Sequence, residues 1–303
     1  MSHPGEEPGA GGAAPPGLGI TRFVARGTTR LTYEAIGAAG APVVVALHDL
    51  LTDRVVWRPW AVALAHAGDR LLLLDARGHG ASAALSSRPY PPTELAADVL
   101  AILDAEGIAT AHLAGHGWGA GVALTVAQLG PGRVASLLLL QPDLPGLLAN
   151  DDDPAARWLA SVARESRSAA AATAAKGQTE RALDTLLDPR LGHGWQTRVS
   201  KAKLAAIRRY AGSLGAILAG AEGHEPAPEG MRALTMPALI LRHAAAPEPD
   251  ARVADRLAAL LPNASAPPPF GSAADEARTL SPGDPAVIAA SLTFLDGLSS
   301  GEN

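Results

Sequence analysis

The chain has 303 residues, of which 48% are hydrophobic and 18% are charged, so its composition is that of a folded globular protein. A net charge of −5 gives no reason to expect a nucleic acid or an anionic membrane surface as a partner. The absence of cysteine excludes disulfides, thiolate metal sites and a cysteine nucleophile. No apolar run approaches the roughly 20 residues of a membrane span, and no signal peptide is evident, so we expect a cytoplasmic protein with no membrane partner.

The N-terminal part of the sequence divides into a tail and the first strands. Residues 1–17 are rich in Gly, Pro and Ala without apolar periodicity, which predicts a disordered tail. Apolar and polar residues alternate over 20–27 and 29–37, which predicts a strand pair that turns at Gly27. The continuous β-branched run over 42–48 predicts a strand buried on both faces.

From this strand onward, predicted helices and strands alternate along the chain. They are a helix over 52–68, a strand over 70–75, a helix over 93–107, a strand over 109–116, a helix over 117–130 and a strand over 135–142. Thr52 and Thr93 are the expected N-caps of the first two helices. Buried strands that alternate with amphipathic helices predict βαβ units and a parallel sheet.

The alternation of predicted strands and helices stops in the second half of the chain. Residues 145–235 carry helical patterns with no strand of their own, which predicts a helical insertion. The pattern of the sheet then resumes, so we expect one α/β core built from residues 18–144 and 236–298. Its last predicted elements are a strand over 236–242, a helix over 250–261 and a helix over 284–298.

Three motifs in order connect this pattern to a known family. They are "ALHDL" at 46–50, "DARGHGAS" at 75–82, which fits D-x-R-G-H-G-x-S, and "AGHGWGAG" at 114–121. Together with the insertion and the closing helix, they resemble the α/β-hydrolase superfamily over residues 19–298. The resemblance implies an α/β fold with a mostly parallel central sheet flanked by helices and covered by a helical cap.

The same resemblance implies a catalytic triad, with a serine on a sharp strand-to-helix turn, an acid after a late strand and a histidine near the end. In this chain the serine position falls on Gly117. The expected acid positions, Ala244–Ala246, are all alanine, and no histidine follows His243. From these three absences we infer that the triad is lost and that the chain is not a serine hydrolase.

Glycine at the turn has a conformational consequence. The nucleophile of the family sits at positive φ, which glycine adopts freely. We therefore expect Gly117 to keep the turn and to leave a void where a serine hydroxyl would stand, either as a vacated substrate site or through degeneration. The resemblance places an oxyanion hole at the backbone N–H groups of Leu50 and Trp118, which could still polarise a substrate carbonyl.

The family usually has glycine where this chain has Asp49. Asp49 is our candidate catalytic base if its carboxylate points into the pocket, and the alternative is that it accepts hydrogen bonds from its own loop as in an Asx turn. His48 and His116 complete the candidate substrate-binding set with Leu50, Gly117 and Trp118, although the family's usual role for His48 is structural and His116 packs away from the pocket in relatives.

Other polar residues suggest structural roles or no site. His79 in the D-x-R-G-H-G-x-S motif is expected to be structural. Asp143 follows a predicted strand, and without a histidine partner we expect it to cap its loop. His112 and His116 are four residues apart on a strand, which does not place them on one face, so we expect no metal site. The first βα turn lacks a Gly-rich phosphate motif, so we expect no cofactor.

Three functional hypotheses follow. The first is a non-hydrolytic enzyme of the epimerase, isomerase, cyclase or lyase type, which binds a small molecule or peptide under the cap and uses the oxyanion donors and chemistry supplied partly by the substrate. In lacking the triad the chain is similar to the bottromycin epimerase group, which implies bacterial specialised metabolism. The second is a catalytically silent ligand-binding protein. The third is a hydrolase with a non-standard set, such as a water activated by Asp49.

Overall fold

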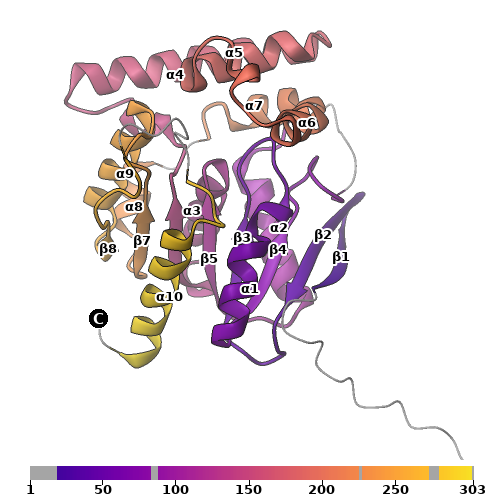
Figure 1. The fold of residues 1–303 in the computed structure, drawn as a ribbon, viewed down its shortest axis with the longest axis vertical. Helices are drawn as coiled ribbons and strands as arrows, with labels where there is room; N and C mark the ends of the chain where they lie inside the picture. The colour runs from indigo at the N-terminus through magenta and orange to yellow at the C-terminus, as the bar shows by residue number, and fades with distance from the viewer. Residues whose placement is uncertain (1–18, 83–87, 225–226, 273–279, 302–303) are drawn as a thin grey trace, which may run out of the picture.

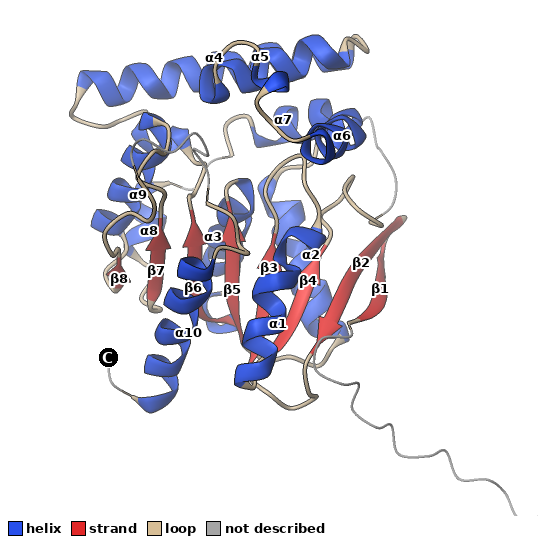
Figure 2. Cartoon of the chain, in the orientation of Figure 1, coloured by secondary structure: helices blue, strands red, loops and turns tan. Residues whose placement is uncertain are grey.

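The computed structural model describes residues 19–82, 88–224, 227–272 and 280–301, so the predicted tail lies outside the described residues. The strands are β1 (Ile20–Arg26), β2 (Thr29–Ile36), β3 (Val43–Leu47), β4 (Arg70–Leu74), β5 (Ala111–His116), β6 (Val134–Leu140), β7 (Ala238–Leu241) and β8 (Ala264–Ser265). In the described ranges they form one sheet in the order β1-β2-β4-β3-β5-β6-β7-β8 (Figure 2). β2 runs antiparallel to β1 and to β4, and the other neighbouring pairs are parallel. The predicted fold class is confirmed.

The central strands are apolar on both faces because helices cover the sheet from both sides. In β4, Leu71 and Leu73 join one hydrophobic cluster, while Leu72 and Leu74 join the other. This alternation of one leucine run between two cores is what a parallel strand inside an α/β sandwich requires. It explains why "RLLLL" has no polar face.

Two layers of helices form these cores. The core helices are α1 (Arg58–Ala67), α2 (Pro92–Ala105), α3 (Trp118–Leu129), α8 (Pro228–Arg232), α9 (Glu248–Leu260) and α10 (Pro285–Ser300). α1 and α10 pack on one face through Trp60 and Val287, and α2, α3 and α9 pack on the other (Figure 1).

Some predicted helix starts are wrong. The helix expected from Thr52 begins as a short 3₁₀ turn whose N-cap is Asp53, while the Thr52 hydroxyl donates to the Asp49 carbonyl at 2.7 Å. The helix expected from Thr93 begins one residue earlier, after Pro91, because proline already has the φ of a first turn and lacks the N–H that would remain unsatisfied there.

The cap consists of α4 (Pro154–Ala175), α5 (Thr179–Leu191), α6 (Lys201–Tyr210) and α7 (Leu214–Ala221). These helices lie across the edge of the sheet at which the parallel strands end (Figure 1). The described residues of 145–235 contain no strand. Leu51, from the loop after β3, packs into the hydrophobic cluster of the cap with Leu183 and Trp195. None of the helices in the described ranges combines the length and apolarity that a membrane crossing requires.

Candidate functional site

The turn between β5 and α3 has the geometry of a nucleophile elbow. Gly117 lies at φ 53° and ψ −115°, a conformation that is strained for residues with a side chain. Its N–H donates to the Leu140 carbonyl at 2.9 Å, and its carbonyl accepts from the Asp143 N–H at 3.1 Å. The elbow is therefore built and anchored between two strands, with glycine at its tip.

The space above this glycine is filled. A Cβ placed on Gly117 would lie 2.1 Å from Asp49 Oδ1 and 2.3 Å from Asp49 Cγ. The expected void is thus absent, because a carboxylate from the loop after β3 occupies the position where an elbow side chain would begin. β3 and β5 are neighbours in the sheet, so the two loops meet at the same edge.

The two expected oxyanion donors converge as predicted, but on the chain's own carboxylate. The N–H groups of Leu50 and Trp118 both donate to Asp49 Oδ1, each at 2.8 Å. Hydrogen bonds to a carboxylate are shorter and stronger than neutral ones, so they hold this side chain in one orientation. The two N–H groups expected to form an open oxyanion hole are therefore engaged by a carboxylate of the chain itself. Asp49 Oδ2 accepts no hydrogen bond from the described residues.

The side chains of two neighbouring histidines form hydrogen bonds with backbone groups. His48 Nε2 accepts from the Ala76 N–H at 3.0 Å, and its Nδ1 donates to the Asp49 carbonyl at 2.8 Å. His79 Nε2 accepts from the Leu51 N–H at 3.3 Å. Burial lowers the pKa of His48 and lowers that of His79 to about 3, so both rings stay neutral near pH 7. The Nδ1 of His79 donates to the Arg77 carbonyl at 3.0 Å, so both ring nitrogens of each histidine are engaged with the backbone and neither is left for proton transfer.

His116 differs from these two. Its Nδ1 is buried and has no hydrogen-bond partner in the described part of the protein, and burial lowers the pKa of the ring. It does not line the cavity that contains Asp49. His112, which shares its strand, pairs instead with the Ser136 hydroxyl at 2.7 Å.

A cavity of about 500 Å³ separates this edge of the sheet from the cap, and we call it the cap cavity. Its floor includes Asp49, Leu50 and Trp118, and the cap contributes Val162 and Leu187 among other apolar side chains. Of the candidate substrate-binding residues, Leu50 and Trp118 line it, whereas His48, His116 and Gly117 do not. A cavity of this size, with apolar side chains from the cap and charged groups on its floor and wall, suits a small ligand of a few hundred daltons.

A network of ion pairs forms one wall of the cap cavity. Arg190 from α5 donates to Asp143 Oδ2 and to Asp250 Oδ2, each at 2.7 Å. Arg167 from α4 donates to Asp143 Oδ1 at 2.7 Å. The predicted loop cap is therefore wrong: within the described residues the Asp143 carboxylate accepts hydrogen bonds from these two arginines, and it links the end of β6 to two helices of the cap.

The pKa values within this network move in opposite directions. Burial raises the pKa of Asp143, but Arg167 and Arg190 outweigh burial and hold it below its usual value. Burial raises the pKa of Asp250, and a single guanidinium, that of Arg190, does not compensate. Arg190 itself remains charged, because three carboxylates, including Asp49, act against the effect of burial.

Among the described residues, two that are not glycine have a positive φ, and both border the site. Leu51 has φ 61° and Gln141 has φ 42°. The Gln141 amide donates to Asp250 Oδ2 at 3.1 Å and accepts from the Leu280 N–H at 3.0 Å. Backbone strain of about 1–3 kcal/mol per residue persists where the surroundings impose it, often at functional sites. The strain therefore marks the same loops as the carboxylate and the ion pairs.

Four residues of this site were not among those predicted from the sequence: Arg167, Arg190, Asp250 and Gln141. The charged residues of the cap offered no signal, because an arginine on an amphipathic helix usually faces solvent and its partner lies far away in the sequence. Their role becomes visible only when α4 and α5 are placed over the strand ends.

Parts of this chain are similar in sequence to curated proteins. Epoxide hydrolase B of Mycobacterium tuberculosis is 41% identical over 98 residues, which are 32% of this chain and 28% of that protein. Epoxide hydrolase A of the same organism is 37% identical over 135 residues, which are 43% of this chain and 41% of that protein. The matches to such curated relatives span less than half of each relative's length.

Solved structures match over nearly the whole chain. An alpha/beta hydrolase from Sphaerobacter thermophilus superposes with a TM-score of 0.72 at 22% identity, covering 90% of this chain and 100% of that chain. The enol-lactonase from Burkholderia xenovorans superposes with a TM-score of 0.68 at 21% identity, covering 92% of this chain and 100% of that chain. Residues 42–213, more than half of the chain, match the family model of the alpha/beta hydrolase fold. The protein belongs to the α/β-hydrolase superfamily, whose named relatives here are hydrolases.

Proposed function

We propose that this protein is a non-hydrolytic enzyme that binds a small molecule or peptide under the cap and uses the Asp49 carboxylate as its proton-accepting group. One observation carries the proposal: Asp49 Oδ1 is fixed by the N–H groups of Leu50 and Trp118, while Oδ2 accepts no hydrogen bond from the described residues on the floor of the cap cavity. Epimerisation and elimination beside a carbonyl group begin with the transfer of a C–H proton to such a base.

The fixed orientation supports catalysis, because a base held in place needs no reorganisation when the substrate reacts. The apolar side chains in the lining of the cap cavity, such as Val162 and Leu187, give the apolar part of a substrate a place to bind beside this carboxylate. In this mechanism the substrate supplies its own stabilisation of the developing charge, since the oxyanion donors are already engaged by Asp49.

Hydrolysis through a serine is disfavoured by the residues themselves. Gly117 offers no nucleophile, Ala244–Ala246 offer no acid, and the sequence has no histidine after His243. A triad-free site keeps only the modest acceleration that comes from binding and from backbone donors.

A catalytically silent binding protein is the second candidate, and it is favoured by the same pair of hydrogen bonds. A substrate carbonyl that needs the N–H groups of Leu50 and Trp118 must first displace Asp49. In this alternative the Asp49 carboxylate blocks the two backbone N–H groups, and the cap cavity binds a ligand without reaction.

Deuterium exchange separates these candidates without knowledge of the natural substrate. The protein is incubated in D₂O with carbonyl compounds that carry acidic C–H groups, including lactones and short peptides, and mass spectrometry measures deuterium in the recovered compound. Phenyl acetate and styrene oxide are the hydrolysis probes. Asp49→Asn removes the base, and Asp152→Asn is the matched control, because Asp152 is exposed and its side chain forms no hydrogen bond in the described ranges.

We expect exchange in the wild-type protein and in Asp152→Asn, and its loss in Asp49→Asn, with no hydrolysis above buffer. Exchange that survives in Asp49→Asn would remove Asp49 from the mechanism. Binding without exchange by any compound would favour the silent protein. Hydrolysis that Asp49→Asn abolishes would establish the third hypothesis, an aspartate-dependent hydrolase.

A further inference from the structure

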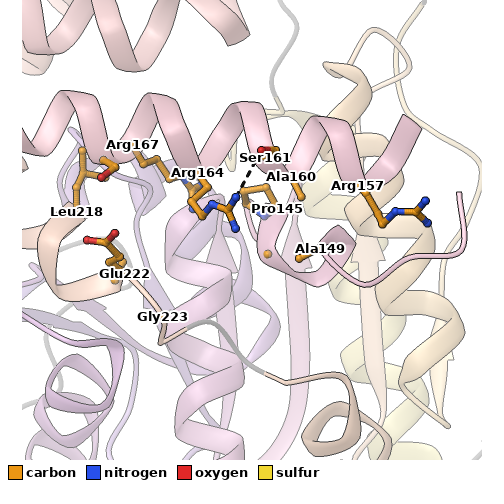
Figure 3. Close-up of a pocket in the computed structure, with 13 residues that line it drawn as sticks. Pro145, Ala149, Arg157, Ala160, Ser161, Arg164, Arg167, Leu218, Glu222 and Gly223 are labelled. Carbon is orange, nitrogen blue, oxygen red and sulfur yellow. Dashed lines mark hydrogen bonds between the residues drawn. The ribbon is translucent and has the colours of Figure 1, made fainter. Parts of the chain in front are cut away.

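A second cavity of about 490 Å³ lies beneath α4 beside the cap cavity, and we call it the outer cavity (Figure 3). The two cavities share Pro145, Arg167, Leu218 and Ala221 in their linings. The two cavities are therefore neighbours, and Asp49 forms part of the floor of the cap cavity.

Three arginines of α4 line the outer cavity, and they differ in what they contact. Arg167 is bound to Asp143, and Arg157 donates to the backbone carbonyls of Asp151 and Asp152. Arg164 forms a single contact within the described residues, a long hydrogen bond of 3.5 Å to the Ser161 hydroxyl. Its guanidinium has no carboxylate partner in the described ranges, although a planar guanidinium is well suited to bind one through two parallel hydrogen bonds.

An acidic side chain without a partner lies in the same cavity. Glu222 follows α7 and forms no side-chain hydrogen bond or ion pair within the described residues. In Figure 3, Arg164 and Glu222 extend into the space beneath α4, while Arg157 points away from it. The outer cavity therefore presents one uncompensated positive group and one uncompensated negative group that do not pair with each other.

This pair of charges discriminates between classes of ligand. A simple anion gains a contact with Arg164 but is repelled by Glu222, and a simple cation has the reverse problem. A ligand that carries both an ammonium and a carboxylate satisfies both side chains at once. We propose that the outer cavity binds the zwitterionic head group of an amino acid, with its carboxylate on Arg164 and its ammonium on Glu222.

The rest of the ligand is apolar, apart from the carbonyl group whose neighbouring acidic C–H the proposed function places at Asp49. Its tail passes Leu218 and enters the cap cavity, whose lining there includes Val162 and Leu187. This inference names the substrate class for the function proposed above, and it rests on that function only for the claim that the tail then reacts at Asp49. The binding itself is independent of Asp49.

Three probes with the same alkyl tail test the head group: 2-aminooctanoic acid, octanoic acid and octylamine. Isothermal titration calorimetry measures their affinity for the wild-type protein and for Arg164→Gln, Glu222→Gln and Arg181→Gln. Arg181 is the matched control, because it is an exposed arginine of the cap that lines neither cavity. Arg164 and Glu222 are also exposed, so we expect these substitutions to leave the thermal midpoint unchanged.

We expect wild type and Arg181→Gln to bind the zwitterion at least about tenfold more tightly than either singly charged probe. Arg164→Gln should lose the preference over octylamine, and Glu222→Gln should lose the preference over octanoic acid. Equal affinity for the three probes in the wild-type protein, or no measurable binding of the zwitterion, overturns the inference. A preference for the zwitterion over octylamine that survives Arg164→Gln also overturns it.

Asp49→Asn separates this inference from the proposed function. It should bind the zwitterion with wild-type affinity, because Asp49 does not line the outer cavity. If the wild-type protein discriminates the probes but exchanges no deuterium with any compound, the proposed function fails and the head-group site stands. If deuterium exchange depends on Asp49 but the three probes bind with equal affinity, the head-group site is refuted and the proposed function stands.

Discussion

Substituting Gly117 by alanine tests whether the Asp49 carboxylate really occupies the elbow. The new Cβ would lie 2.1 Å from Asp49 Oδ1, a distance at which one of the two groups must move. Positive φ at a residue with a side chain costs about 1–3 kcal/mol. Displacing the carboxylate also breaks two hydrogen bonds to a charged group, each worth about 1.5–3 kcal/mol. We therefore expect Gly117→Ala to lower the free energy of unfolding by several kcal/mol.

A double-mutant cycle isolates the steric part. In Asp49→Gly the space above Gly117 is empty, so adding Gly117→Ala should cost only the backbone strain. Gly27→Ala is the matched control for that strain, because Gly27 has φ +60° and its Cβ would meet nothing within 4 Å. The free energies come from urea unfolding followed by tryptophan fluorescence, provided that the m-value is constant across the variants.

The expected coupling between positions 49 and 117 is at least about 1 kcal/mol, which is within the range seen for residues in direct contact. The cost of Gly117→Ala in the Asp49→Gly background should approach that of Gly27→Ala. If the two substitutions are additive, the carboxylate does not occupy the elbow in solution, and both the occupied oxyanion hole and the role proposed for Asp49 are refuted.

Three further predictions concern chemistry, the cap and pH. Gly117→Ser should show no esterase activity on phenyl acetate above the wild-type background, since no described histidine is placed to take the hydroxyl proton; turnover in this variant would reveal a base that we have missed. Amide hydrogen exchange should be faster in α4 and α5 than in β5, and equal protection without ligand would argue for a rigid cap. The pKa of Asp143 is below its usual value, so its ion pairs contribute fully at neutral pH and the contribution is lost as pH falls below about 4. Asp143→Asn should therefore lose stability at pH 7 and show a weaker acid dependence of the urea midpoint, and a parallel dependence in both proteins would contradict this sign.

The architecture could be predicted because its signals are local. The leucine run of β4 and the glycine spacing of the elbow have few alternative structures, and both appear where expected. β8 was missed because Ala264 and Ser265 form a two-residue strand with no apolar pattern. The N-caps at Thr52 and Thr93 were wrong because a neighbouring Asp53 and a proline at the helix start compete for the same role.

The candidate site was predicted in its parts and missed in its arrangement. Asp49, Leu50, Gly117 and Trp118 were all identified, and the Asx-type contact was one of the alternatives for Asp49. The sequence did not indicate that this contact and the oxyanion donors are the same interaction. That fact depends on the side-chain position of one residue relative to a loop that follows a neighbouring strand, and no periodicity encodes it.

The departures at positions 49 and 117 are best understood as one structural change. The carboxylate of Asp49 and any side chain at position 117 compete for the same space, so an aspartate after His48 is compatible with the elbow only if the elbow carries glycine. Random decay has no reason to place a carboxylate on the two backbone donors that the family uses for a developing negative charge. An isolated void would be filled as well by an apolar side chain, and at lower desolvation cost. The presence of glycine at position 117 together with a carboxylate at position 49 therefore favours a site that has changed its chemistry over one that has lost it. The cost of Gly117→Ala in the presence and in the absence of Asp49 measures the coupling free energy between the two positions.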